Sequence, residues 1–372
     1  MVDRGEPVDK RAFNEALVNK EAIGNLKLVV MDDIKTRQER GGDVSEAHSF
    51  AHLNNVSRLA PFVGTLYGYT SREQMLAQAA SLFHDLVRSP SEDPKVKDEE
   101  ASSNAAKSKL EELNNVGIVV TTPEAREAIG YAIERQGQYP SWFADPSTRE
   151  QVPQKLGDKL WLALFVADKL EANGVRVIAR RSSFVAGDRL KREDGDWRQF
   201  GFKPGQDEGK VVAIESMVRL AIINPEEVYP KRLKPIVGLL YQVQREFVLG
   251  ICKSLGLSIE DLAKILINTR NKDGKNIVEV RKLKCPSDAE ELRRFIESRS
   301  GISEKSIQET SADYVSSAME TVNYFSNRYT EDLDNLMTRW GPKGDAARDW
   351  QRGMVEYVNG QWFDKVEASL KK

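Results

Sequence analysis

Apolar residues recur every three or four positions along most of this chain, which is the spacing of an amphipathic helix. In the N-terminal half, several such segments follow helix-start signals, for example Ser71 and Thr122. The predicted helices there cover residues 10–19, 46–66, 72–87, 99–113, 124–135 and 153–172. Few stretches alternate as a β-strand does, and VGIVVTT at 116–122 is the best of them. The pattern predicts an all-α fold.

The helical pattern stops at residues 186–209, where glycine and charged residues replace most apolar ones. This composition is typical of a loop, a hairpin or a disordered insert. Beyond it, the predicted helices cover residues 210–223, 234–255, 258–267, 288–299, 306–337 and 345–358. We therefore predict a domain over 1–185, an insert over 186–209, and a C-terminal helical region of unassigned role over 210–372.

Composition excludes several classes of protein. The 55 basic and 57 acidic residues nearly cancel, so no strong net field draws the chain to nucleic acid or to an anionic membrane. The longest apolar run, LWLALFVA at 160–167, is far shorter than the roughly 18 residues of a membrane span. The N-terminus lacks an apolar signal core, and the only cysteines are Cys252 and Cys285. We therefore expect a cytoplasmic protein with neither a membrane nor a nucleic acid as partner.

All three histidines fall in one early segment of the chain. His48 and His52 are four residues apart in a helical pattern, which places both rings on one helix face. His84 is followed by Asp85 at the end of the next predicted helix, so packing of the two helices could bring His52 beside them. Two neutral imidazoles and a carboxylate suit a divalent transition metal.

A hydrolytic metal site needs a further anionic ligand and open positions for water. Asp168 is the strongest candidate, because it follows the apolar stretch 161–167, where an unpaired carboxylate would be costly. A metal ion or the adjacent Lys169 would offset that cost. Simpler interpretations stand beside this one, since a lone histidine is more often not a ligand and Asp168–Lys169 could be a surface ion pair.

The order His52, His84-Asp85, Asp168 resembles the H…HD…D signature of the HD-domain metal-dependent phosphohydrolases. Over about residues 45–185 the chain resembles the small bacterial HD nucleotide pyrophosphohydrolases. The segments that carry it are AHSFAHLNNVSRLA, ASLFHDLVR, DEEASSNAAKSKLEEL and VADKLEANGVRVIARR. The resemblance implies an HD-domain helical bundle, followed here by an additional C-terminal helical region.

The resemblance also implies a metal centre. A single divalent ion, Mn, Mg, Fe, Ni or Zn, would activate a water for attack on phosphorus. Its ligands would be His52, His84, Asp85 and Asp168. Asp85 would then be catalytic as well as a ligand, and His48 would orient the substrate or protonate the leaving group.

The implied substrate is a nucleotide, for example a nucleoside triphosphate cut to a monophosphate and pyrophosphate. Charge on the phosphoryl oxygens needs cationic groups, and the candidates are Lys169, Arg180 and Arg88. The chain departs from the family pattern at several surrounding positions, which are Ser49, Asn55, Asp98, Arg135 and Gln136. These departures leave the metal ligands in place, but they put the substrate in doubt and argue against a two-metal site.

Two alternatives therefore stay open. One is a phosphodiesterase that acts on a cyclic nucleotide or an oligonucleotide. The other is an inactive HD module that senses a nucleotide and passes the signal on through the C-terminal half. The C-terminal helices could also join two copies of the chain in a homo-oligomer.

Overall fold

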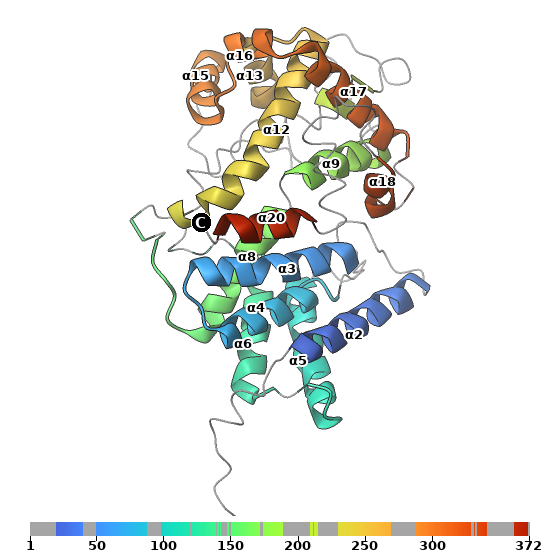
Figure 1. Cartoon of the computed structure of the whole chain (residues 1–372), viewed down its shortest axis with the longest axis vertical. Coiled ribbons are helices and arrows are strands. Elements are labelled where there is room, and N and C mark those ends of the chain that lie inside the picture. The colour runs from blue at the N-terminus through green and yellow to red at the C-terminus, as the bar shows by residue number, and fades with distance from the viewer. Residues whose placement is uncertain are drawn as a thin grey trace, which may run out of the picture. The chain divides into compact units, whose positions relative to one another are not determined.

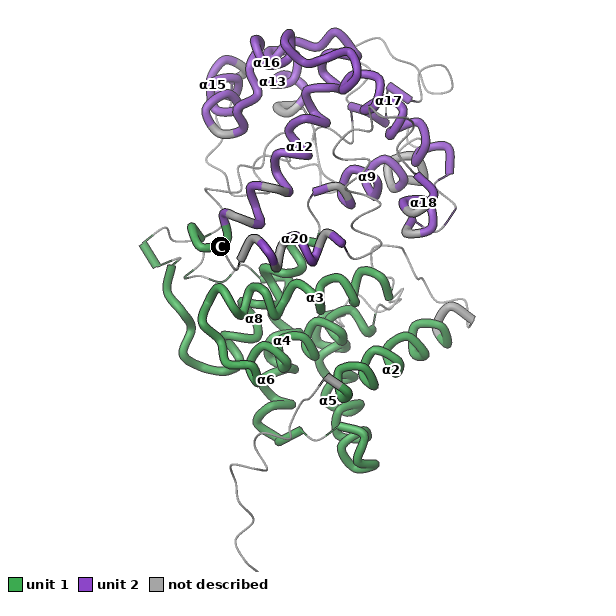
Figure 2. The backbone as a smooth tube through the Cα atoms, viewed as in Figure 1, with its two compact units in different colours: residues 1–171, 230–233 green, residues 172–229, 234–372 purple. Residues whose placement is uncertain are grey.

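The structure is a computed structural model in which every described element is a helix, so the predicted all-α class is confirmed for these residues (Figure 1). It describes residues 20–39, 50–87, 98–119, 121–138, 140, 142, 147–148, 150–171, 174–188, 209–210, 212–214, 230–268, 288–328, 331, 333–340 and 361–370. The chain forms two compact units, residues 1–171 with 230–233 and residues 172–229 with 234–372 (Figure 2). This division falls upstream of the segment 186–209, in which the sequence placed the insert.

The first unit is built around a helix that is apolar on all sides. Its helices are α2 (Lys20–Glu39), α3 (Phe50–Leu66), α4 (Ser71–Phe83), α5 (Asp98–Asn115), α6 (Pro123–Glu134) and α8 (Leu156–Glu171). Helices α3, α4 and α6 all pack on α8, and α5 packs on α6. Residues 160–167 of α8 are buried without exception, as expected for a helix without a polar face. The apolar run LWLALFVA is therefore the core of this unit.

Most predicted helices of this unit are confirmed, with ends shifted by a few residues. Helix α4 begins one residue earlier than predicted, because Thr70 and Glu73 form a reciprocal capping box. Helix α6 also begins one residue earlier than predicted, at Pro123, directly after its cap Thr122. Helix α2 was not predicted, although its buried residues Leu26, Val30 and Ile34 have helical spacing. The predicted helix 10–19 lies outside the described residues.

The best strand candidate, 116–122, is not a strand in the residues described there. Val116 to Val119 form the turn that ends α5, in which the Ile118 amide donates to the Leu113 carbonyl at 2.9 Å. Gly117 has a φ of 74°, a left-handed conformation that favours glycine and ends helices. Val116 and Ile118 are exposed, so their alternation with glycine reflects a helix end and not a sheet face.

The second unit is a separate group of helices. Its members are α9 (Val175–Asp188), α12 (Lys234–Leu255), α13 (Ile259–Asn268), α15 (Ala289–Ser300), α16 (Glu304–Glu309), α17 (Ala312–Ser326), α18 (Leu333–Arg339) and α20 (Gln361–Leu370). Helices α12 and α17 pack on each other and on α9, and α13 packs on α15. Helix α12 has the bounds predicted for 234–255. None of the described helices is long and apolar enough to cross a membrane.

The prediction of one long helix over 306–337 is wrong. Three helices occupy this region, and the first break falls at Thr310 and Ser311, both in extended conformation. Ser311 caps α17 by accepting a hydrogen bond from the Tyr314 amide at 3.4 Å. Helix α20 was not predicted, and the predicted helix 345–358 lies outside the described residues. Only the first residues of the predicted helix 210–223 are described, and they are helical.

A short helical turn returns the chain to the first unit after residue 229. This turn, η3 (Lys231–Leu233), packs on α3. The Arg232 guanidinium lies over the Tyr67 ring, 4.5 Å from its centroid, and donates to the Glu150 carbonyl at 2.6 Å. The Lys231 amide donates to the Glu150 carboxylate at 2.7 Å. The first unit is thus assembled from two separate stretches of the chain.

Candidate metal centre

Four side chains that the sequence singled out meet inside the first unit. His52 is in the first turn of α3, His84 caps the C-terminus of α4, Asp85 lies in the turn that follows, and Asp168 is in the last turn of α8. Because α3, α4 and α8 pack on one another, their ends bring these residues together. His52, His84 and Asp85 form a buried group that could hold a metal ion.

Side-chain atoms of these residues converge on one point. The two Nε2 atoms of His52 and His84 are 3.2 Å apart. Oδ2 of Asp85 lies 3.7 Å from the first and 3.4 Å from the second. Oδ1 of Asp168 lies 3.6 Å from His52 Nε2 and 4.0 Å from His84 Nε2.

These separations can be compared with those of ligand atoms around one ion. Ligand atoms about 2.1 Å from an ion are about 3.0 Å apart at a right angle and about 3.4 Å apart at a tetrahedral angle. Two of the five separations, 3.2 and 3.4 Å, lie in this range, and the largest, 4.0 Å, exceeds it by about 0.6 Å. His52, His84 and Asp85 are therefore spaced nearly as ligands of one ion, and Asp168 would have to move closer to join them.

The hydrogen bonds of the two rings turn their lone pairs towards this point. His84 Nδ1 must carry a hydrogen, because its partner at 2.7 Å is the Ser81 carbonyl. His52 Nδ1 must likewise donate to Glu171 Oε2, at 2.8 Å. In the neutral rings both Nε2 atoms are then acceptors that face each other. Such an arrangement needs a cation between them, either a proton or a metal ion.

The pKa shifts of these side chains agree with the need for a cation. Burial alone would lower the pKa of His52, but the surrounding carboxylates, Glu171 first, outweigh it and raise that pKa. Burial lowers the pKa of His84, so this ring is neutral near pH 7. Burial would raise the pKa of Asp168, but Lys169 and the two imidazoles lower it to about 2. Asp168 is therefore ionised across the physiological range.

Two residues that the sequence did not assign to the site support it from outside. Glu171 lies one turn after Asp168 on α8, is 1% exposed, and holds His52 through Nδ1. Gln136 lies just after α6 and contacts Asp85. The spacing from Asp168 to Glu171 could have placed both carboxylates on one helix face. The sequence singled out Gln136 only as a departure from the family pattern, because no helical spacing links it to Asp85, 51 residues away.

We expect Glu171→Gln to weaken metal binding by about tenfold to a hundredfold, the usual loss when an outer partner of a ligand histidine is changed. The amide oxygen can still accept the hydrogen bond from His52 Nδ1, but the negative charge of the carboxylate is lost. The lone pair on His52 Nε2 therefore becomes less basic and binds a metal ion more weakly. Calorimetric titration with Mn²⁺ or Zn²⁺ measures this change. Glu111→Gln, at an exposed position of α5, is the control. Equal affinities in the two variants would contradict the role given to Glu171.

The remaining predicted residues have mixed outcomes. Lys169 donates to Asp168 Oδ2 at 2.8 Å, and its side chain is 44% exposed, so the simple ion pair is present beside the site. Arg180 is half-buried on α9, in the second unit. His48 and Arg88 lie outside the described residues. Lys169 is thus the predicted phosphate-binding residue that the structure places next to the candidate ligands.

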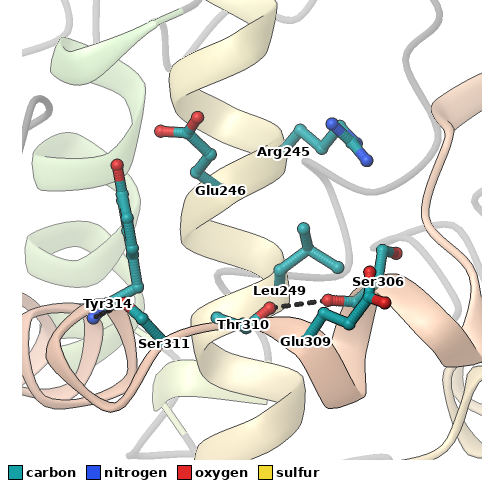
Figure 3. Close-up of a pocket in the computed structure, with 8 residues that line it drawn as sticks. All are labelled: Arg245, Glu246, Leu249, Ser306, Glu309, Thr310, Ser311 and Tyr314. Carbon is teal, nitrogen blue, oxygen red and sulfur yellow. Dashed lines mark hydrogen bonds between the residues drawn. The ribbon is translucent and has the colours of Figure 1, made fainter.

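A pocket of about 350 Å³ lies in the second unit, between α12 and the connection from α16 to α17. Figure 3 shows the residues that line it. Its polar lining mixes opposite charges, with Arg245 beside Glu246 and Glu309. Arg245 donates twice to the Gly301 carbonyl, and Thr310 Oγ1 donates to the Ser306 carbonyl. These groups are used in joining the helices, so this pocket is a weaker candidate than the histidine cluster.

Comparison with protein-family models, with curated proteins and with solved structures found no match to the chain. The function must therefore be inferred from the residues of this chain and from the resemblance of its motifs.

Proposed function

We propose that the chain is a metal-dependent phosphohydrolase that acts on a nucleotide. The observation that carries this proposal is the convergence of two histidine nitrogens, 3.2 Å apart, with two carboxylate oxygens that lie 3.4–4.0 Å from them. The resemblance of the surrounding motifs to HD phosphohydrolases supports the reaction class and the choice of a nucleotide.

A divalent ion held here would polarise a phosphoryl oxygen and lower the pKa of a bound water. His52 and His84 would offer Nε2, with Glu171 and the Ser81 carbonyl fixing the two rings. Asp85 and Asp168 would supply negative charge to balance the cation. Lys169, released from Asp168, would offer its ammonium group to a substrate phosphate.

Exposure indicates from which side a substrate would approach. His52, His84 and Asp85 are at most 3% exposed. The side chains of Asp168 and Lys169 are 21% and 44% exposed. A phosphoryl group would therefore reach the centre past Asp168 and Lys169, with the rings and Asp85 behind it, shielded from water.

The test is hydrolysis of a panel of nucleoside triphosphates and cyclic nucleotides with Mn²⁺ or Mg²⁺, resolving phosphate from pyrophosphate. We expect the wild type to release a phosphate product and His84→Ala to release none. Glu134→Ala, at an exposed position of α6, should behave as the wild type. Cleavage of cyclic nucleotides alone would instead indicate a phosphodiesterase.

A second candidate function is a module that binds a nucleotide without cleaving it. One observation favours it, since Lys169 already neutralises Asp168 and the other candidate ligands are buried. Metal binding without turnover of any substrate in the panel would support this candidate and contradict the hydrolase.

A further inference from the structure

We propose that Gln136 is a positioning residue of the metal centre, and that it holds Asp85 so that a single carboxylate oxygen faces the histidines. The inference rests on the proposed metal centre and adds a residue that acts on the ligand Asp85.

The contacts of Gln136 single it out. Its side chain reaches from the turn after α6 to the turn after α4, and the residue is 7% exposed. Nε2 donates to the His84 carbonyl at 3.0 Å and to Asp85 Oδ1 at 3.1 Å. One amide group thus fixes the main chain at one candidate ligand and the carboxylate of the next.

The orientation of the amide follows from its partners. A carbonyl oxygen and an ionised carboxylate both only accept hydrogen bonds, so the NH₂ group must face them. Both of its hydrogens are then used. The amide oxygen, Oε1, is buried and has no hydrogen-bond partner within the described part of the chain. A buried acceptor without a hydrogen-bond partner lowers the stability of the fold, and an apolar side chain of the same length would avoid this loss. The two donated hydrogen bonds are therefore what Gln136 contributes at this position.

The bond to Oδ1 determines how Asp85 can bind. A free aspartate can turn about its last side-chain bond and can offer one oxygen or both. With Oδ1 held by Gln136, Oδ2 is the oxygen that faces the His52 and His84 nitrogens, at 3.7 and 3.4 Å. Gln136 thereby fixes single-oxygen binding and keeps Asp85 in place before an ion arrives.

The experiment compares the full chain with Gln136→Met, which keeps the length of the side chain and removes both donors. Co²⁺ is the probe, and both its dissociation constant and its visible absorption spectrum are measured. We expect the dissociation constant to rise about tenfold to a hundredfold and the spectrum to change, because Asp85 Oδ1 then loses the hydrogen bond from Gln136. Gln138→Met makes the same substitution at an exposed position two residues further on and should leave both unchanged.

A second variant separates positioning from damage to the fold. Gln136→Asn keeps the amide but is one methylene shorter, and it should show the same loss. Without metal, every variant that shows the effect should still unfold in one cooperative transition above the temperature of the binding assay, although the loss of the two hydrogen bonds lowers its stability. Wild-type affinity and spectrum in both Gln136 variants would overturn the inference and leave the metal centre intact. If the wild type itself binds no Co²⁺, the proposed metal centre fails, and the inference fails with it.

Discussion

Asp85→Asn is expected to abolish metal-dependent stabilisation of the protein. The substitution keeps the shape of the side chain, and the amide oxygen can still accept from Gln136. It removes the negative charge that faces the two histidines at 3.4 and 3.7 Å. Since the loss of an outer partner lowers affinity by about ten- to a hundredfold, the loss of a ligand should lower it by more than about a hundredfold.

Thermal unfolding with and without Mn²⁺ measures this effect directly. An ion at about a hundred times its dissociation constant stabilises the wild type by about 2.7 kcal/mol, and this increment should vanish in Asp85→Asn. Without metal the variant should melt no lower than the wild type, because one of three neighbouring carboxylates, Asp85, Asp168 and Glu171, has lost its charge. Asp32→Asn, exposed on α2, is the matched control. An undiminished increment in Asp85→Asn would show that the ion binds elsewhere.

Phe247→Ala is expected to destabilise the second unit by about 3–5 kcal/mol, the range for removing a buried aromatic side chain. Phe247 is fully buried on α12, five residues before Cys252. Cys252 is also fully buried, and burial raises the pKa of its thiol to about 12. The thiol should therefore resist alkylation until the unit opens, which makes it a reporter of opening.

The measurement is the rate of Cys252 labelling in a Cys285→Ser background, which leaves one thiol in the chain. Each 1.4 kcal/mol is about a tenfold change in the population of the open state. Where reclosing is faster than the labelling reaction, labelling should therefore accelerate by about two to three and a half orders of magnitude. Lys264→Ala, exposed on α13, should leave the rate unchanged. A Phe247→Ala rate within a few-fold of wild type would contradict the packing described for α12.

Convergence of the candidate ligands could be predicted because each one is marked by its helix. His52 shares one face of a predicted helix with His48, His84 lies near the end of the next, and Asp168 follows an apolar run that had to be buried. The two residues that hold these ligands, Glu171 and Gln136, were harder to predict. Glu171 is an acid near a helix end, where solvated acids are common, and only the tertiary structure shows it against His52.

Helix ends and helix breaks were the weakest part of the fold prediction. The pattern over 306–337 keeps a helical period across Thr310 and Ser311, so periodicity alone could not show the break. The signal was local, a serine three residues before Tyr314 that could cap a new helix. At 116–122 the pattern predicted an element that is absent from the described residues there. Val116 and Ile118 alternate with other residues as in a strand, but they are exposed in the turn that ends α5.

The return of the chain at η3 has a consequence for biosynthesis. Glu171 ends the first stretch of the first unit, and Leu233 ends the second, 62 residues later. A ribosome adds about 5–20 residues per second, so this delay is roughly 3–12 seconds. During it, α3 and α8 can already bring the candidate ligands together, but Tyr67 and Glu150 still lack Arg232. A nascent chain would therefore bring its candidate metal ligands together before its first unit is complete.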